Sequence, residues 1–169
     1  MLISKKMNAA LNEQVGHELG ASLQYVQIAS YFAGEALGKL SGLFFKQSAE
    51  ERDHAMRLAK YILDAGGEVQ IPAIPAPRHQ FKSAVEAVQA ALDWELEVTR
   101  QINGLVDLAI KENDHLTHAM LTWFVKEQLE EVSSMDNLLK LVQRAGQNLL
   151  YVDHTLTHES GEAGPESHS

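Results

Sequence analysis

Ser48-Ala49-Glu50-Glu51-Arg52-Asp53-His54-Ala55 is the stretch on which the interpretation of this sequence depends. Within it, Glu51 and His54 stand three residues apart, and residues three apart lie on one face of a helix. The same face continues into the apolar residues Leu58 and Ile62, so we expect it to be buried. Burying an unpaired charge costs free energy. Two explanations are open for the pair alone: a bound metal ion, or a salt-bridged or hydrated surface pair, which is the commoner role of an isolated E-x-x-H.

Four long segments have the periodicity of amphipathic helices. Gly66-Gly67 and Gly146 stand where helices commonly end. Ser83-x-x-Glu86 has the form of a capping box at a helix start. The last eleven residues are rich in Gly, Ser and Glu, which predicts a disordered tail. The predicted elements are helices over about residues 4–33, 40–65, 83–112 and 115–145, a short fifth helix over about 147–158, one domain over 1–158, and the tail over 159–169.

The segment between the second and third helices is unsuited to a helix, because Pro72, Pro75 and Pro77 stand close together. About fifteen extended residues reach roughly 50 Å, whereas a helix of about 27 residues is roughly 40 Å long. The linker can therefore run the length of a bundle, so that the second and third helices lie parallel. A domain linker is the alternative, but neither flank has the size of a stable domain. The prediction is an all-α fold, a four-helix bundle with this long crossover and a short fifth helix.

Each predicted long helix carries a glutamate about halfway along its apolar face. Four carboxylates at matching depth repel one another unless they are protonated or bridged by cations. Two divalent ions would balance them, since four carboxylates carry −4. Lysines and arginines fall mostly elsewhere, which argues against a non-catalytic bundle whose acids are held in salt bridges. The pattern therefore favours a dinuclear metal site built on Glu18, Glu51, Glu95 and Glu131, with His54 beside them.

The composition limits the chemistry of such a site. A net charge of −9 over 169 residues argues against nucleic acid as the main partner. The absence of cysteine excludes disulfides, thiolate zinc sites and cysteine nucleophiles, and favours harder ions such as iron or manganese. The N-terminus has no apolar stretch of signal-peptide length, and no apolar run approaches the length needed to span a bilayer. We expect a cytoplasmic protein without a membrane partner.

In their order and spacing, four motifs make the chain resemble the prokaryotic non-haem ferritins over about residues 5–158. The arrangement also matches the ligand pattern of ferritin-like di-iron bundles, except that the fourth helix lacks a second histidine. The motifs are Gly16-His17-Glu18-Leu19 with Tyr25, Ala49 to Ala55, Trp94-Glu95, and Trp123 to Glu131.

This resemblance implies iron storage in a homo-oligomeric cage of 24 subunits, with ferroxidase activity that oxidises Fe(II) by O2 or H2O2. Iron is the implied metal, at a di-iron centre with a possible third site. The corresponding residues are Glu18, Glu51 and His54 on the first iron; Glu51, Glu95 and Glu131 on the second; Gln128 beside the second iron; Tyr25 adjacent to the centre; and Glu50, Glu127, Glu130 and Glu131 at the third site.

Two related families are the alternatives. Haem-binding bacterioferritins have a second histidine on the fourth helix, where this chain has Glu130 or Glu131. Their haem-ligating methionine follows the glutamate of the second helix, where this chain has Arg52, so no haem is expected. A rubrerythrin-like di-iron oxidase or peroxidase would more often carry a cysteine-rich part, and this chain has no cysteine.

Overall fold

Five helices make up most of the computed structural model, which describes residues 1–159 and, for side chains, residues 1–156. No strand occurs within residues 1–159, so the predicted all-α class is confirmed. The observed helix ends lie within two residues of the predicted ones. Glu159, expected in the tail, ends the fifth helix, and residues 160–169 lie outside the described part of the chain. The helices are α1 (Lys5–Gly34), α2 (Gly38–Asp64), α3 (Ala84–Lys111), α4 (His115–Ala145) and α5 (Leu149–Glu159).

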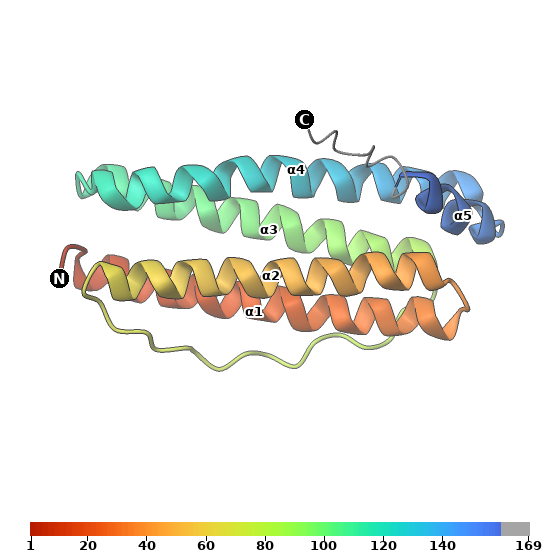
Figure 1. Cartoon of the computed structure of the whole chain (residues 1–169), viewed down its shortest axis with the longest axis horizontal. Helices are drawn as coiled ribbons and strands as arrows, with labels where there is room; N and C mark the ends of the chain where they lie inside the picture. The colour runs from red at the N-terminus through yellow and green to blue at the C-terminus, as the bar shows by residue number, and fades with distance from the viewer. Residues whose placement is uncertain (160–169) are drawn as a thin grey trace, which may run out of the picture.

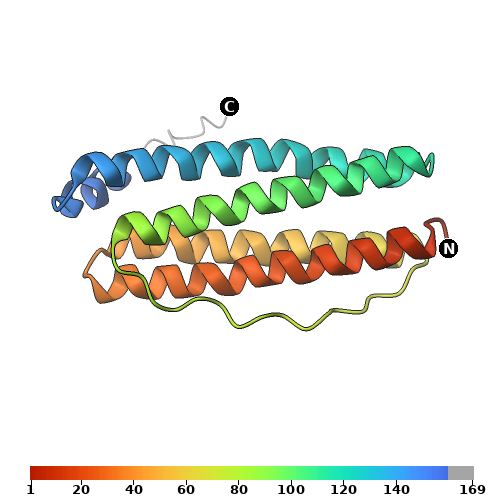
Figure 2. The same ribbon diagram turned by 180° about the vertical axis from the view of Figure 1, so that it is seen from behind.

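The bundle consists of two antiparallel hairpins, α1–α2 and α3–α4, packed against each other (Figure 1). The chain crosses from the end of α2 to the start of α3 through an extended linker that runs the length of the bundle (Figure 2). α2 and α3 therefore run in the same direction, as the proline-rich linker predicted. The short α5 packs against α2 and α4 at one end of the bundle. None of the described helices is long and apolar enough to cross a membrane.

The linker is fixed to α1 by side-chain amides. Asn12 accepts a hydrogen bond from the backbone N–H of Gln70 at 2.6 Å. Farther along, Gln24 donates to the carbonyl of Arg78 at 2.8 Å and accepts from its N–H at 2.9 Å. Between these points the linker lies directly on α1, because a Cβ at Gly16 would stand only 2.5 Å from the ring of Pro72. A glycine in the middle of α1 thus allows the crossover to pass.

Both local and distant residues cap the helices. The Ser83 hydroxyl accepts from the N–H of Glu86, as the capping box predicted, whereas the Glu86 carboxylate reaches the N–H of Lys82 rather than that of Ser83. At the start of α2 no local side chain caps the helix. Instead, Asp153 of α5 accepts from the N–H of Leu40 at 2.8 Å. The fifth helix therefore supplies the cap of the second.

The interior is divided into two apolar clusters. Along α1, Leu11 and Val15 belong to one cluster, whereas Tyr25 and Phe32 belong to the other. α2 contributes to the same two clusters in the opposite order, with Phe44 in the cluster of Tyr25 and Leu58 in the cluster of Leu11. In both helices the change falls at the buried acids: Glu18 in α1 and Glu51 in α2. The middle of the bundle is therefore a polar layer between two hydrophobic cores.

Candidate metal centre

The four mid-helix glutamates lie inside this polar layer. Each comes from a different helix of the bundle, and none is more than 6% exposed. The helical period explains this, because a residue in the apolar stripe points inward whatever its polarity. His54 lies one helical turn after Glu51 and is 5% exposed. The structure therefore brings together the core residues that the sequence predicted: Glu18, Glu51, His54, Glu95 and Glu131.

His54 faces acids through both ring nitrogens. Its Nδ1 lies 3.3 Å from Glu51 Oε2 and 3.9 Å from Glu18 Oε2. Its Nε2 lies 3.9 Å from Glu127 Oε2. Among the described residues, His54 Nδ1, Glu18 Oε2 and Glu51 Oε1 are buried without a hydrogen-bond partner. Buried polar atoms are normally paired, so these orphaned atoms are suited to coordinate a cation.

Three groups of side chains bring potential ligand atoms within 4.8 Å of one another. The group that contains Glu18 has its residues on α1 and α2, whereas the group that contains Glu95 has its residues on α2, α3 and α4. Each pair of groups shares one residue, so neighbouring ions would share a ligand. The groups are Glu18, Glu51 and His54; Glu51, Glu95 and Glu131; and His54, Glu127 and Glu131.

Glu95 is held by neutral donors. The buried hydroxyl of Tyr25 donates to its Oε1. The side-chain amide of Gln128 donates to its Oε2 at 3.2 Å and to its backbone carbonyl at 3.1 Å. The same amide lies 3.1 Å from the Thr99 hydroxyl, which itself donates to the carbonyl of Glu95. Tyr25 and Gln128 therefore lie beside the acids, as the resemblance implied, and both orient Glu95.

Burial raises the pKa values of all four acids. Burial raises the pKa of Glu51 to about 9, and the neighbouring Glu95 adds to the rise. Burial and Glu95 raise the pKa of Glu131 to about 8. The pKa of Glu18 rises well above its ordinary value through burial and the proximity of Glu51. Burial also raises the pKa of Glu95, although the Tyr25 hydrogen bond opposes the shift. Without a cation, this site favours bound protons.

The donor set fits divalent or trivalent iron. Carboxylate oxygens and one imidazole nitrogen are ligands suited to such ions, and the chain contains no cysteine that could supply a thiolate. A cation would replace the protons that the acids otherwise hold, and it would bind the orphaned atoms of Glu18, Glu51 and His54. The arrangement can therefore hold two ions that share the carboxylate of Glu51.

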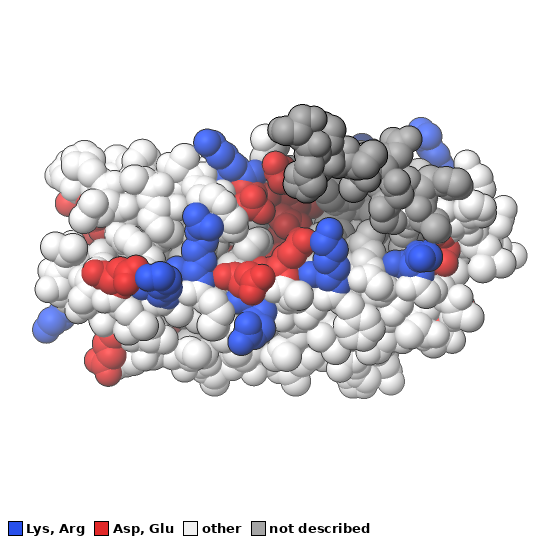
Figure 3. Space-filling model, viewed as in Figure 1, with Lys and Arg blue, Asp and Glu red and all other residues white. Residues whose placement is uncertain are grey.

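The residues implied for a third ion are only partly brought together. Glu127 and Glu131 lie close enough to His54 to share an ion with it, but Glu50 and Glu130 belong to none of the three groups. Glu50 instead lies 3.8 Å from the ammonium of Lys46. All these acids line a hollow of 420 Å³ between α2 and α4. Figure 3 shows red acidic side chains in this recess, with basic side chains around it. The hollow reaches the centre, because His54 and Glu131 also line it.

Some residues at the centre were not identified from the sequence. Gln14 donates its amide to Glu18 Oε1 at 2.9 Å, and Thr99 contacts Gln128 as described above. Both stand four residues from a metal-site glutamate on the same helix, which is the spacing that could have revealed them. Trp123 lies edge-on to His54 with the ring centroids 5.3 Å apart. The guanidinium of Arg57 stacks 3.9 Å from the centroid of the Trp123 ring.

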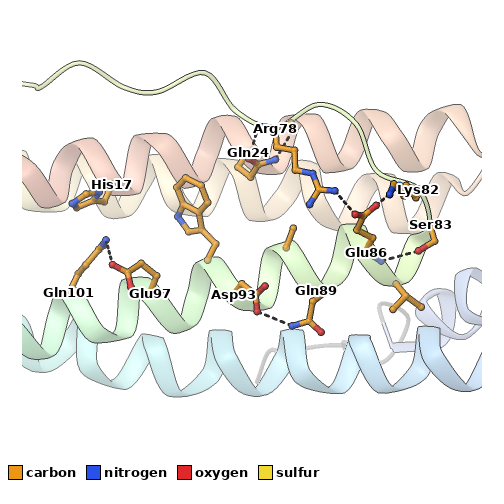
Figure 4. Close-up of a pocket in the computed structure, with 13 residues that line it drawn as sticks. His17, Gln24, Arg78, Lys82, Ser83, Glu86, Gln89, Asp93, Glu97 and Gln101 are labelled. Carbon is orange, nitrogen blue, oxygen red and sulfur yellow. Dashed lines mark hydrogen bonds and ion pairs between the residues drawn. The ribbon is translucent and has the colours of Figure 1, made fainter.

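A larger hollow, of 810 Å³, lies between α1, α3 and the linker (Figure 4). Two of its three acids, Glu86 and Glu97, are paired with arginines, unlike the acids of the metal centre, whereas Asp93 accepts a hydrogen bond from the Gln89 amide at 2.8 Å. The hydrogen bond from the N–H of Lys82, and then that from Arg78, hold the pKa of Glu86 below its ordinary value. Arg100 lowers the pKa of Glu97 in the same way. His17 also lines this hollow and is exposed, because it lies about 100° around the helix from the buried Glu18.

Comparisons of this chain with a family model and with known proteins all point to the same family. A family model described as a ferritin-like domain matches residues 8–145. Ferritin BfrB of Mycolicibacterium smegmatis is 40% identical over 164 residues, covering 97% of this chain and 91% of the relative. A bacterial non-heme ferritin of Staphylococcus haemolyticus is 34% identical over 153 residues, covering 89% of this chain and 92% of that protein.

A solved structure has the same fold. The open pore ferritin from the hyperthermophilic archaeon Archaeoglobus fulgidus superposes with a TM-score of 0.89 at 33% identity, over 92% of this chain and 96% of that one. The agreement extends over the four long helices that carry the buried acids. By fold, by the mid-bundle carboxylates and by these similarities, the chain belongs to the ferritin family.

Proposed function

We propose that this protein stores iron and oxidises Fe(II) at the centre formed by Glu18, Glu51, His54, Glu95 and Glu131. The observation that carries the proposal is the set of four buried carboxylates, which have no basic partner other than His54 among residues 1–156. The ferritin relatives support the storage function. Gln128 and Tyr25 adjoin the second ion, and Glu127, with Glu50 and Glu130 around it, serves the third.

The chemistry requires two ferrous ions side by side. Each Fe(II) gives one electron, and O2 accepts two electrons and two protons to become hydrogen peroxide. When hydrogen peroxide is the oxidant, it accepts two electrons and two protons to become water. The shared carboxylate of Glu51 would keep the two ions adjacent, and the anionic ligands stabilise Fe(III) over Fe(II). The protein thus supplies geometry and charge, whereas the redox chemistry belongs to the metal.

Substitution at the centre tests this proposal. We expect Glu51→Ala and His54→Ala to abolish rapid Fe(II) oxidation, measured by the rise of ferric absorbance in air, because each removes a residue shared by two ion positions. Glu97→Ala is the matched control, since Glu97 lies on the same helix as Glu95 but is exposed and paired with Arg100. Unchanged oxidation in the two centre variants would disprove the assignment.

Particle size tests the storage role. The proposal includes a homo-oligomeric cage of 24 subunits in the cytoplasm, so size-exclusion chromatography with light scattering should give about 24 times the 18.7 kDa chain mass. After aerobic loading, we expect a ferric mineral inside the particle by electron microscopy. A small oligomer that turns over Fe(II) without retaining iron would instead indicate the rubrerythrin-like oxidase or peroxidase.

Haem content separates this proposal from a bacterioferritin. The residue after Glu51 is Arg52, an exposed residue whose guanidinium cannot replace a thioether as a haem ligand. We therefore propose a haem-free protein. The absorbance spectrum of the protein purified from haem-supplemented cells should lack a Soret band, and a stoichiometric Soret band would contradict this part of the proposal.

A further inference from the structure

A buried glutamine lies next to the centre and has no part in the mechanism proposed above. Gln14 stands on α1, one helical turn before Glu18, and is 2% exposed. Its neighbours Leu11 and Val15 belong to an apolar cluster. Burying an amide in such surroundings costs free energy unless it is hydrogen-bonded. The hydrogen bond recorded for its amide nitrogen goes to Glu18 Oε1, at 2.9 Å.

This hydrogen bond makes the two oxygens of Glu18 unequal. Oε1 is occupied by the Gln14 amide. Oε2 has no hydrogen-bond partner among the described residues and lies 3.9 Å from His54 Nδ1. It is therefore the free oxygen that points to the position between Glu18, Glu51 and His54.

A neutral amide is well suited to this task. A lysine at the same place would neutralise the carboxylate and repel an incoming cation. An amide donor fixes the orientation of the carboxylate and leaves its negative charge available. The other hairpin uses the same chemistry, since the Gln128 amide donates to Glu95 Oε2. Each hairpin thus supplies one amide that holds one acid.

We infer that Gln14 is a positioning residue for the first metal ion: its amide holds one oxygen of Glu18 so that the other faces Glu51 and His54. The inference rests on the proposed function, because Glu18 must be a ligand for its orientation to matter. Gln14 itself does not touch the ion. Its contribution is to reduce the side-chain freedom that Glu18 would lose on binding.

Metal binding without turnover provides the test. Co(II) has the charge of Fe(II), and without added oxidant it stays divalent. Equilibrium titration of the full-length protein with Co(II) therefore reports affinity alone. We expect at least two binding steps in the unchanged protein, for the two ions that share Glu51. Gln14→Met keeps the length of the side chain but removes the donor. It should weaken one step by about 10–100-fold, the usual effect of losing a ligand's hydrogen-bond partner, and leave the other within about twofold.

A second buried glutamine on the same helix is the matched control. Gln24 is 4% exposed, and its amide binds the linker at Arg78 rather than an acid of the centre (Figure 4). Gln24→Met should therefore leave both Co(II) steps within about twofold, although it loses two part-buried hydrogen bonds to the linker. Glu18→Ala identifies the step that depends on Glu18, and Gln14→Met should cause no further loss in that background.

The outcomes are distinct. If the unchanged protein does not bind a pair of Co(II) ions, the proposed centre itself is wrong. If it does, and Gln14→Met binds both ions as before or weakens both steps equally, only the role of Gln14 is overturned. A Gln14→Met or Gln14→Leu chain that fails to fold by circular dichroism, while Gln24→Met folds, also overturns it, because Gln14 would then be a residue of the core.

Discussion

Tyr25 is a buried residue beside the metal centre. Its hydroxyl donates a hydrogen bond to Glu95, one of the proposed metal ligands. Burial raises the pKa of Tyr25 well above its ordinary value, and the nearby acids Glu95 and Glu51 add to the rise. The hydroxyl therefore remains protonated and acts as a donor. Its hydrogen bond opposes the rise in the pKa of Glu95 that burial causes.

We expect Tyr25→Phe to weaken the metal-binding step that depends on Glu95 by about 10–100-fold, because Glu95 loses one of the donors that orient it. The ring still fills the same space, so the fold should be retained. Co(II) titration measures the affinity, with Tyr61→Phe as the control. Tyr61 is half-buried and hydrogen-bonded to Thr117, a partner outside the centre. Equal effects of the two substitutions would show that Tyr25 has no special relation to the site.

The inward direction of the key acids could be predicted from the sequence, whereas their hydrogen bonds could not. Helical spacing fixes the angle and depth of Glu18, Glu51, Glu95 and Glu131, so four mid-stripe acids had to meet. The choice of carboxylate oxygen bound by Gln14 depends on side-chain rotamers and on packing between helices. The same applies to His54, which faces Glu127 through Nε2, while Glu50 lies next to Lys46.

At the scale of elements, the close passage of the linker over α1 depends on one glycine. A Cβ added at Gly16 would stand 2.5 Å from Pro72 Cγ and 3.1 Å from its Cδ. Both groups are stiff, since one belongs to a helix and the other to a proline ring. The linker must move for any larger residue to fit.

We expect Gly16→Ala to lower the free energy of unfolding by about 1–3 kcal/mol, because overpacking outweighs the better helix propensity of alanine. Gly104→Ala is the matched control. Gly104 lies inside α3, and a Cβ there would meet nothing within 4 Å. This change should stabilise the protein by about 0.5–1 kcal/mol. Chemical denaturation measures both effects, and two stabilising alanines would disprove the steric constraint at Gly16.

Helix positions were predictable because their signals are local, as in the Ser83 and Asp114 caps. The start of α2 was harder to predict. The sequence pattern placed the first residue of this helix at about Leu40, but the helix begins at Gly38. Asp153 caps this end from a helix more than a hundred residues away. Such a contact exists only in the folded chain, so no local pattern contains it.

At the scale of the whole molecule, the raised pKa values link stability to pH. Glu51 and Glu131, with pKa values of about 9 and 8, hold protons in the metal-free folded chain at neutral pH. In the unfolded chain they titrate near the ordinary value of 4.5. Between those limits the unfolded state binds fewer protons than the folded state, so the free energy of unfolding falls as pH rises.

We expect the metal-free protein to have a lower melting temperature at about pH 8 than at about pH 5.5. The double variant Glu51→Gln, Glu131→Gln should show a flatter dependence, because the two raised pKa values are gone. Adding Co(II) at about pH 8 should raise the melting temperature, since the ion binds the folded chain. Differential scanning calorimetry measures all three, and a melting temperature that rises with pH in the metal-free protein would contradict the burial argument.

The hairpin architecture has a mechanical consequence. Glu18, Glu51 and His54 all come from the α1–α2 hairpin, whereas the group of Glu51, Glu95 and Glu131 spans both hairpins. An ion in the second proposed position would therefore join two halves of the molecule that are otherwise connected covalently only through the extended linker. It would act as a removable crosslink between the two hairpins. Amide exchange along the facing sides of the hairpins should quicken when a chelator withdraws that ion, while exchange within each hairpin changes less.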